Sequence, residues 1–269
     1  MIGNNYNGLY ITKTTGTLEF TDVKSSKNQA TGIVVDAGTL SFQMSDSLVE
    51  ENGAQGLHIL NQVNSTINIY NTQFVRNNNG EGVYLQAFRY CYVRLLEVLS
   101  LGNSQNGALF TRLSDTRLDL NSCKFDGNSN IGVSVAYFFR GGLNLEEIST
   151  SNNYGSGYAF ELGDTSINIE SSSSFGNGRD GFYVENQGGE VVLKDFIAGG
   201  NKRQGLWFLD TKSVRLRSVH LLNCNVSGNS KYGVLFYLMY RSDQRPENYV
   251  IKVANSTIFN NSQIGRAHV

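Results

Sequence analysis

The sequence contains a single proline, Pro246, and only three histidines and three cysteines among its 269 residues. None of the histidines or cysteines has the spacing of a zinc site or a candidate Ser-His-Asp or Cys-His partner, so no metal site or catalytic triad is expected. No run reaches the roughly 18 apolar residues of a membrane-spanning helix, which argues against membrane insertion. The 22 basic and 23 acidic residues leave a net charge of −1. This balance excludes the electrostatic attraction on which nucleic-acid binding depends.

What is abundant points to β-structure with frequent tight turns. The sequence has 29 glycines, 14 tyrosines and 15 phenylalanines, and 40% of its residues are hydrophobic. Tyrosine and phenylalanine favour strands, whereas glycine, asparagine and serine favour turns. The apolar fraction is sufficient for a sizeable core. We therefore expect an all-β protein with few helices.

A motif of glycine, apolar residue, any residue and apolar residue recurs along the whole chain. The spacings between successive glycines are 24, 24, 26, 25, 25, 25, 24, 24 and 28 residues. An asparagine stands four residues before each glycine, and a second alternating apolar pair follows each glycine. Self-similarity at this period indicates a solenoid. The ten glycines are Gly8, Gly32, Gly56, Gly82, Gly107, Gly132, Gly157, Gly181, Gly205 and Gly233.

Three repeat architectures compete for this pattern. Leucine-rich repeats have a similar length, but their asparagine follows the strand, whereas here it precedes the strand; a propeller blade needs about 40 residues. The pattern favours a parallel β-helix of about ten coils, each of 24–25 residues with three short strands. We predict one such domain over residues 1–262 of a longer protein. Residues 264–269 resemble the translation of a common sequencing adapter, and we expect residues 263–269 to be a tail derived from it.

The repeated asparagine and glycine are expected to form one corner of each coil. Glycine tolerates the left-handed or otherwise restricted backbone of a sharp corner, and inward asparagines can bond their amides to one another. The predicted ladder comprises Asn28, Asn52, Asn78, Asn103, Asn128, Asn153, Asn177, Asn201 and Asn229. From about Asn4 to Asn261 the repeat resembles the right-handed parallel β-helix of the pectate-lyase-like family. More loosely, it is similar to the β-helical ectodomain segments of animal junction proteins of the bark beetle type.

Equivalent outward positions of neighbouring coils should stack into columns, two of which carry candidate ligand-binding residues on the first strand of the coil. Tyr183 and Trp207 adjoin two residues after the glycine, where they could stack on a sugar ring or anchor a protein partner. Glu161 and Glu185 adjoin two residues further on. Paired carboxylates could act as acid and base, or hold Ca²⁺ together with a uronate substrate as the lyases of the resembled family do.

A third column precedes the glycines and is basic. Arg179, Arg203 and Lys231 fall on successive coils and could bind an acidic glycan or an acidic protein loop. An extended chain would separate this column from the glutamates by about 20 Å, so we do not expect one active site from both. For all three columns the alternative is an ordinary solvated or sheet-covering surface. A longer connection near the C-terminus predicts a protruding recognition loop over residues 240–248.

The functional prediction follows from the catalytic signatures that are missing. The sequence lacks the Asn-Thr-Asp, Asp-Asp, Gly-His-Gly and Arg-Ile-Lys motifs of polygalacturonase-like enzymes. We therefore expect a non-enzymatic segment that contacts a glycan or a protein through its outer faces and uses no cofactor. Four Asn-X-Ser/Thr sequons favour an extracellular or cell-surface location. The alternatives are a polysaccharide lyase or glycosidase that uses Glu161 and Glu185, and a phage or bacterial surface spike.

Overall fold

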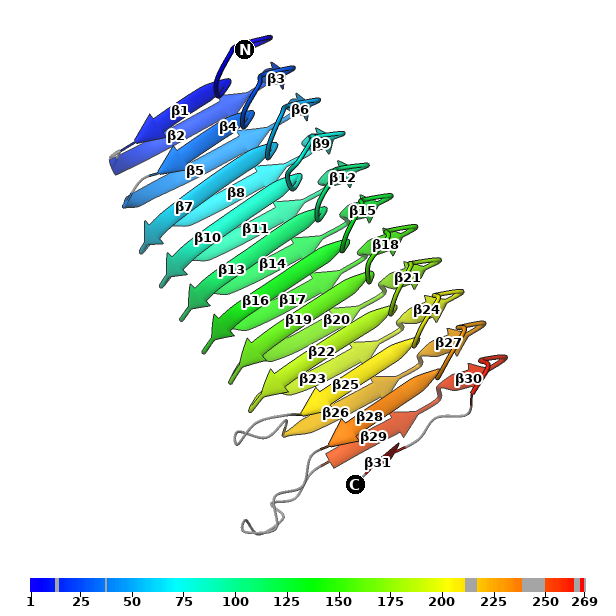
Figure 1. Cartoon of the computed structure of the whole chain (residues 1–269). Helices are drawn as coiled ribbons and strands as arrows, with labels where there is room; N and C mark the ends of the chain where they lie inside the picture. The colour runs from blue at the N-terminus through cyan, green and yellow to red at the C-terminus, as the bar shows by residue number, and fades with distance from the viewer. Residues whose placement is uncertain (13–14, 37, 211–216, 239–249, 264–266, 269) are drawn as a thin grey trace.

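The chain coils into a solenoid of parallel strands, drawn from the N-terminal coil to the C-terminal coil in Figure 1. The computed structural model describes residues 1–269 except 13–14, 37, 211–216, 239–249, 264–266 and 269. Within the described ranges all regular structure is β, and each coil contributes one strand to each of three sheets. The predicted β-helix with three strands per coil is confirmed.

The strands of each sheet are parallel and hydrogen-bond in coil order. Within the described residues the first sheet consists of β1 (Leu9–Thr12), β4 (Ile33–Asp36), β7 (Leu57–Val63), β10 (Val83–Arg89), β13 (Ala108–Ser114), β16 (Val133–Phe139), β19 (Tyr158–Gly163), β22 (Phe182–Gln187), β25 (Leu206–Asp210), β28 (Val234–Leu238) and β31 (Ala267–His268). The second sheet consists of β2 (Thr15–Thr21), β5 (Thr39–Ser45), β8 (Thr66–Tyr70), β11 (Tyr92–Leu96), β14 (Arg117–Asn121), β17 (Gly142–Glu146), β20 (Ser166–Glu170), β23 (Glu190–Lys194), β26 (Ser218–Leu222) and β29 (Val250–Ala254). The third sheet consists of β3 (Lys24–Ser26), β6 (Leu48–Glu50), β9 (Gln73–Val75), β12 (Leu99–Leu101), β15 (Lys124–Asp126), β18 (Ser149–Ser151), β21 (Ser173–Phe175), β24 (Ile197–Gly199), β27 (Asn225–Ser227) and β30 (Thr257–Phe259).

Two predicted segments fall wholly or partly beyond the described residues. The recognition loop predicted at 240–248 lies outside them. Of the expected tail at 263–269, Gln263 forms a parallel bridge with Tyr232 and β31 pairs with β28. The remaining tail residues are outside the described part of the chain.

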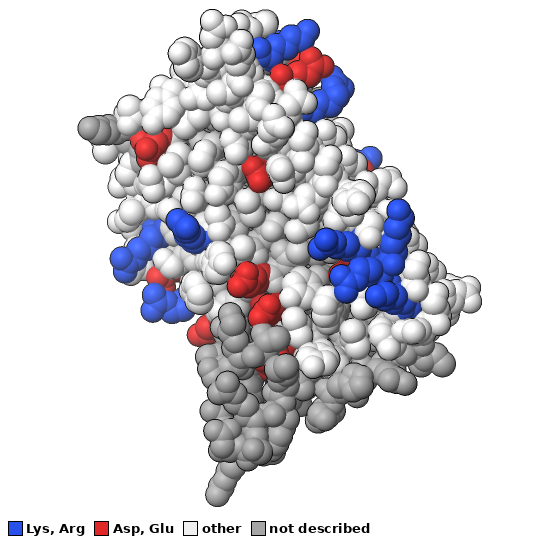
Figure 2. Space-filling model, viewed as in Figure 1, with Lys and Arg blue, Asp and Glu red and all other residues white. Residues whose placement is uncertain are grey.

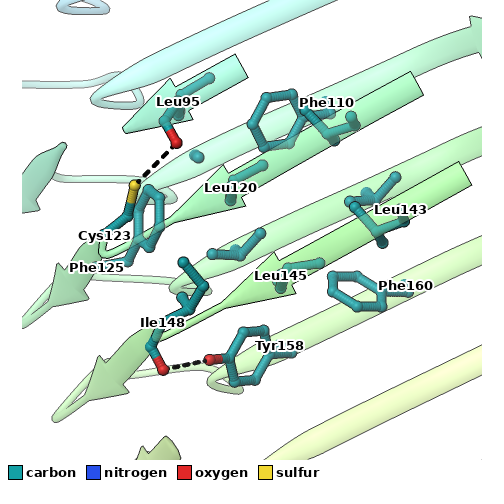
Figure 3. Close-up of a cluster of buried hydrophobic side chains, with 14 of the residues drawn as sticks. Leu95, Phe110, Leu120, Cys123, Phe125, Leu143, Leu145, Ile148, Tyr158 and Phe160 are labelled. Carbon is teal, nitrogen blue, oxygen red and sulfur yellow. Dashed lines mark hydrogen bonds between the residues drawn. The ribbon is translucent and has the colours of Figure 1, made fainter. Parts of the chain in front are cut away.

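The core fills the interior of the solenoid, because alternate side chains of each strand point inward and stack on their equivalents in the next coils. Leu95, Leu120 and Leu145 form one such buried column on the second sheet (Figure 3). Phe110 and Phe160 reach the same interior from the first sheet. Burying a side chain of this size contributes about 1.5–3 kcal/mol relative to leaving it exposed, so the columns are the main source of stability.

An asparagine ladder runs along the corner between the third and first sheets. Each side-chain Nδ2 donates to the Oδ1 of the asparagine in the next coil at 2.8–3.0 Å. The backbone N–H of each asparagine donates to the same Oδ1 at 2.9–3.3 Å. The ladder comprises Asn4, Asn28, Asn52, Asn77, Asn103, Asn128, Asn153, Asn177, Asn201, Asn229 and Asn261.

The prediction of Asn78 as a ladder member is wrong, since its neighbour Asn77 holds that position. The repeat that ends at Gly82 has 26 residues, and it places one additional residue between the ladder asparagine and the glycine. Counting four residues back from the glycine therefore stops one residue late. The side chain of Asn78 is exposed, and only its backbone N–H takes part in the coil, donating to the Asn52 carbonyl at 2.6 Å.

The repeated glycines are required by close packing and not by a left-handed backbone, contrary to the left-handed conformation considered from the sequence. None of the ten, all of which are described, has a positive φ. A Cβ on Gly132 would lie 2.7 Å from the carbonyl oxygen of Gly157 and 2.9 Å from Nδ2 of Asn153. The ladder amide and the carbonyl of the next coil thus occupy the space that any side chain would need.

Buried serines complete this corner in several coils. Ser174 donates its hydroxyl to the Gly181 carbonyl at 2.8 Å and accepts a hydrogen bond from Asn177 Nδ2 at 2.9 Å. Ser25 and Ser100 make the same pair of bonds in their own coils. A polar residue at an inward position is therefore satisfied by the ladder and costs the core little.

Replacing Asn77 by leucine should lower the free energy of unfolding by about 1–3 kcal/mol, because the buried amides of Asn52 and Asn103 lose their partner. The matched change Asn78→Leu, at an exposed side chain, should shift it by less than about 0.5 kcal/mol. Chemical denaturation of both variants measures the difference. Equal losses in the two variants would show that the ladder does not stabilise the fold.

Gly132→Ala should destabilise the protein by about 1–3 kcal/mol, because the added methyl group meets backbone and amide atoms that cannot move freely. Gly142→Ala is the matched control, since no atom lies within 4 Å of its Cβ position. Thermal unfolding followed by circular dichroism compares the two. A Gly132→Ala variant as stable as Gly142→Ala would contradict the packing explanation.

Candidate functional site

The candidate residues lie on the outer face of the first sheet and at the corner that leads into it. The strands β19, β22 and β25 pair in register, which places Tyr183 directly beside Trp207. The same pairing places Glu161 directly beside Glu185. The two outward columns predicted from the repeat are therefore confirmed at these coils. Residues about two dozen positions apart in the sequence face the same stretch of surface.

An aromatic pair occupies the centre of this surface. The rings of Tyr183 and Trp207 are both half-buried, with centroids 4.8 Å apart and planes inclined by 56°. The guanidinium carbon of Arg203 lies 5.2 Å from the centre of the Trp207 ring, within the range of a cation–π contact. The pair therefore presents a flat apolar surface with a positive charge at its edge.

Tyr183 joins the aromatic pair to the glutamates. Its hydroxyl donates a hydrogen bond to Oε2 of Glu185 at 3.3 Å. Burial, together with the negative charges of Glu185, Glu161 and Asp180, raises the pKa of Tyr183 above its usual range. The tyrosine consequently keeps its proton at ordinary pH and can serve as a hydrogen-bond or proton donor.

A hollow of about 300 Å³ adjoins the aromatic pair, at the corner where the strands of the first sheet begin. Its lining includes Tyr183 and Trp207 together with Arg179, Asp180 and Arg203. Basic side chains gather at this end of the strands, on the right of Figure 2, and acidic side chains lie further along the same face. A ligand in the hollow would therefore meet positive charge and aromatic rings together.

Asp180 lies beneath the hollow and pairs with Arg203. Its carboxylate is almost fully buried, lies 3.8 Å from the Arg203 guanidinium, and accepts the backbone N–H of Gln204 at 3.1 Å. Burial raises the pKa of Asp180, and the hydrogen bond from Gln204 and the charges of Arg203, Lys231 and Arg179 offset this only in part. Asp180 is thus a positioning group that fixes Arg203, with too little exposure to meet a ligand.

The basic and acidic columns, which were not expected to form one active site, are linked through Tyr183. Tyr183 lines the hollow beside Arg179 and Arg203, and its hydroxyl reaches Glu185. An outward tyrosine was already expected at this position, but the sequence did not show that its side chain spans the distance. The described lining of the hollow includes neither glutamate and not Lys231, although the charge of Lys231 acts on Asp180.

Asp180 was not predicted as a site residue, because it occupies an inward position of the repeat. It directly precedes Gly181, and the residue before the glycine is polar in most coils. Asn7, Asn106 and Asp180 each accept a backbone N–H of the next coil through this side chain. The recurrence of Asn, Thr, Gln, Glu, Ser and Asp at one repeat position was the signal that could have identified an inward polar column.

Metal ligands and membrane-spanning segments are not evident in the part of the chain that the structure describes. No group of three or more His, Cys, Asp or Glu side chains is arranged to hold a metal ion there. The neighbouring Glu161 and Glu185 supply two carboxylates, which is fewer than such a group requires. No described helix has the length and hydrophobicity required to cross a bilayer.

The three cysteines Cys91, Cys123 and Cys224 are free. Burial raises the pKa of Cys123 to about 12, so its thiol stays protonated.

The raised pKa of Asp180 predicts a specific pH dependence of stability. An aspartate in the unfolded chain titrates near pH 3.9, whereas the folded carboxyl holds its proton to higher pH. Wild-type protein should therefore lose stability, relative to Asp180→Asn, as the pH rises above about 4. Melting temperatures of both proteins across this range measure the difference, and a difference that is constant or grows in favour of the wild type would contradict it.

Comparison with solved structures places similar solenoids among carbohydrate-active enzymes. The A-module of the mannuronan C-5 epimerase AlgE4 of Azotobacter vinelandii is 12% identical, with a TM-score of 0.56 over 93% of this chain and 64% of that chain. The AlgE6 A-module of the same organism is also 12% identical, with a TM-score of 0.59 over 90% of this chain and 65% of that chain. This chain thus covers less than two thirds of either module. At these identities the likeness shows the fold alone.

Pectate lyase Pel9A is a further similar structure, 14% identical with a TM-score of 0.47 over 94% of this chain and 69% of that chain. No curated protein matches the sequence. The comparisons give no support to the loose likeness with animal junction proteins. The family model described as "Right handed beta helix region" matches residues 64–221, which is more than half of the chain. The chain therefore belongs to the right-handed β-helix family.

Proposed function

We propose that this chain acts on an acidic polysaccharide across β19, β22 and β25, as a carbohydrate-active protein of the lyase type. One observation carries the proposal. The Arg203 guanidinium lies over Trp207, Trp207 packs on Tyr183, and the Tyr183 hydroxyl bonds to Glu185, so basic, aromatic and carboxylate groups form one continuous series. The similar epimerase modules are named for mannuronan, a uronate polymer, and the charges of this site agree with such a ligand.

The basic and aromatic groups of the series can bind different chemical groups of a uronate chain. Arg179, Arg203 and Lys231 supply positive charge for carboxylate groups, and guanidinium groups can bind carboxylates through two parallel hydrogen bonds. Tyr183 and Trp207 supply a surface on which the apolar face of a sugar ring can stack. Since Asp180 already holds Arg203 in place, little entropy is lost when a ligand carboxylate binds there.

The reaction that these groups favour is elimination next to the uronate carboxylate. A positive charge on that carboxylate stabilises the carbanion that forms when the C5 proton is removed. Glu185 accepts this proton, the freed electron pair forms the C4–C5 double bond, and the C4–O4 bond breaks. Tyr183, which its raised pKa keeps protonated, donates the proton that the departing O4 requires.

Glycan binding without turnover is the second candidate function. It is favoured by the absence of Glu161 and Glu185 from the described lining of the hollow, so a ligand seated there is held by basic and aromatic groups alone. Either function places the protein outside the cytoplasm, where such polymers occur, and this location is part of the proposal. A Ca²⁺ ion shared between the two glutamates and a uronate would make binding sensitive to EDTA.

The test is incubation with mannuronan and polygalacturonate while ultraviolet absorbance reports unsaturated chain ends. Glu185→Gln should lower the rate by at least about 100-fold with binding retained, because it removes the proton acceptor. Trp207→Ala should weaken binding by about tenfold through loss of the ring and its cation–π contact. Tyr10→Ala, at an exposed residue of the same column in the first coil, should change neither quantity.

The outcomes separate the two functions. Binding that depends on Trp207 but yields no unsaturated ends would overturn the enzymatic proposal and support glycan binding. Full activity of Glu185→Gln would remove Glu185 from the mechanism. No binding to either polymer would overturn both functions.

A further inference from the structure

A groove crosses the second sheet, away from the site on the first sheet. Two hollows of about 680 Å³ and 330 Å³ share Tyr92 and Arg117 in their linings, so they lie side by side and together make up this groove. Their lining residues come from β8, β11, β14, β17 and β20 and from the corner that precedes these strands. With neighbouring strands about 4.8 Å apart, a groove over five strands is long enough to seat several units of a polymer.

A missing side chain opens the groove. Tyr92, Arg117 and Gly142 are in register on neighbouring strands and occupy the same outward column. Nothing lies within 4 Å of the position that a Cβ of Gly142 would take. Gly142 has no positive φ that would require glycine there. The side chains of Tyr92 and Arg117 thus stand beside an open space that any larger residue at 142 would fill.

A row of planar polar side chains lies along the groove. The next outward column of the second sheet contains Asn68, Arg94, Asp119, Asn144 and Asn168, paired in register on five successive strands. Amide, guanidinium and carboxylate groups can each form two hydrogen bonds in one plane. The three asparagines of this row each offer a donor and an acceptor, and Arg94 offers donors, which suits the adjacent hydroxyl groups of a sugar.

Asp119 links this row to the column of Tyr92 and Arg117. It accepts hydrogen bonds from Tyr92 Oη at 2.9 Å, Arg117 Nε at 2.9 Å and Asn144 Nδ2 at 2.8 Å. Partial burial on its own would raise the pKa of Asp119, but these hydrogen bonds and the charge of Arg117 lower it below its usual range. The carboxylate therefore stays ionised and holds three side chains in place before any ligand arrives.

The charges of the groove nearly cancel. Arg117 is paired with Asp119, and Arg140 is paired with Asp115 at 3.1 Å. The groove lacks the excess of positive charge found around Asp180, so it has no preference for a polyanion. Its charged lining residues are Arg94, Arg117, Arg140, Asp115, Asp119, Glu146 and Glu170.

We propose that this groove binds a neutral oligosaccharide, with a pyranose ring against Tyr92 and its hydroxyl groups on Arg94, Asn144 and Asn168. The ring of Tyr92 is half-exposed and held by its bond to Asp119, and the guanidinium carbon of Arg117 lies 5.9 Å from the ring centre. A sugar can therefore stack on the part of the ring that Arg117 leaves open, without loss of conformational freedom. The proposal is independent of the site on the first sheet, which differs in charge and lies on another face. One protein would then bind an acidic and a neutral glycan at the same time.

The experiment is isothermal titration of the full chain with cellohexaose, mannohexaose and xylohexaose. At least one should bind with a Kd below about 1 mM. Tyr92→Ala should weaken that binding at least about tenfold through loss of the ring. Gly142→Gln should do the same by filling the groove, since the site has space for a side chain and no hydrogen-bonding group is removed. Ser41→Gln, at an exposed position of the same column outside the groove, is the matched control and should bind as wild type.

Three results would overturn the proposal. One is the absence of binding to all three sugars. Another is unchanged binding in a Gly142→Gln protein whose melting temperature equals that of the wild type. A third is binding of polygalacturonate to the wild-type protein that Gly142→Gln abolishes, because the groove would then bind an acidic glycan. Because the variants leave the first sheet intact, their binding of mannuronan or polygalacturonate reports on the other site separately.

Discussion

The structure depends on the close approach of successive coils at the corner where an asparagine amide meets a glycine. At this corner the side chain of Asn153 bonds to that of Asn177 at 3.0 Å, and the carbonyl oxygen of Gly157 lies 2.7 Å from the position that a Cβ of Gly132 would take. The amide satisfies backbone groups that the bend would otherwise bury without partners. Because the contact recurs in every coil, it fixes the register of the strands that follow it. The alignment of outward side chains on all three faces is therefore a consequence of this corner.

Because of this alignment, residues one coil apart in the sequence lie next to each other on the surface. Tyr183 and Trp207 are 24 residues apart in the sequence and 4.8 Å apart between ring centres. A solenoid can therefore assemble a site from one residue per coil, without the long loops that most folds use for recognition. The two sites described here use the same device with different charges. Asp180 gathers basic residues at one corner, whereas Asp119 pairs its arginine and leaves a groove close to neutral.

The sequence was sufficient to predict the coils, the three sheets and the outward columns, because a fixed period aligns equivalent residues without knowledge of side-chain conformation. It was misleading at Asn78, where one additional residue in the corner shifted the count. The recurrence of polar residues before the glycines indicates an inward polar column, but it does not show that Asp180 in that column lies against Arg203. The groove on the second sheet was not predicted, because it arises from a side chain that Gly142 does not have. These features depend on local volume and contact, which a repeat pattern does not encode.

The coil that contains Asn77 shows where this architecture accepts change. One additional residue lies between Asn77 and Gly82, yet β9 and β10 keep the same pairing with their neighbours as strands in shorter coils. The extra length is absorbed within a single turn, and the vertical stack on either side is undisturbed. Foreign peptides grafted at that bend would project from the solenoid while the faces of the three sheets stay in alignment, which makes this turn a suitable place to display a new segment on the scaffold.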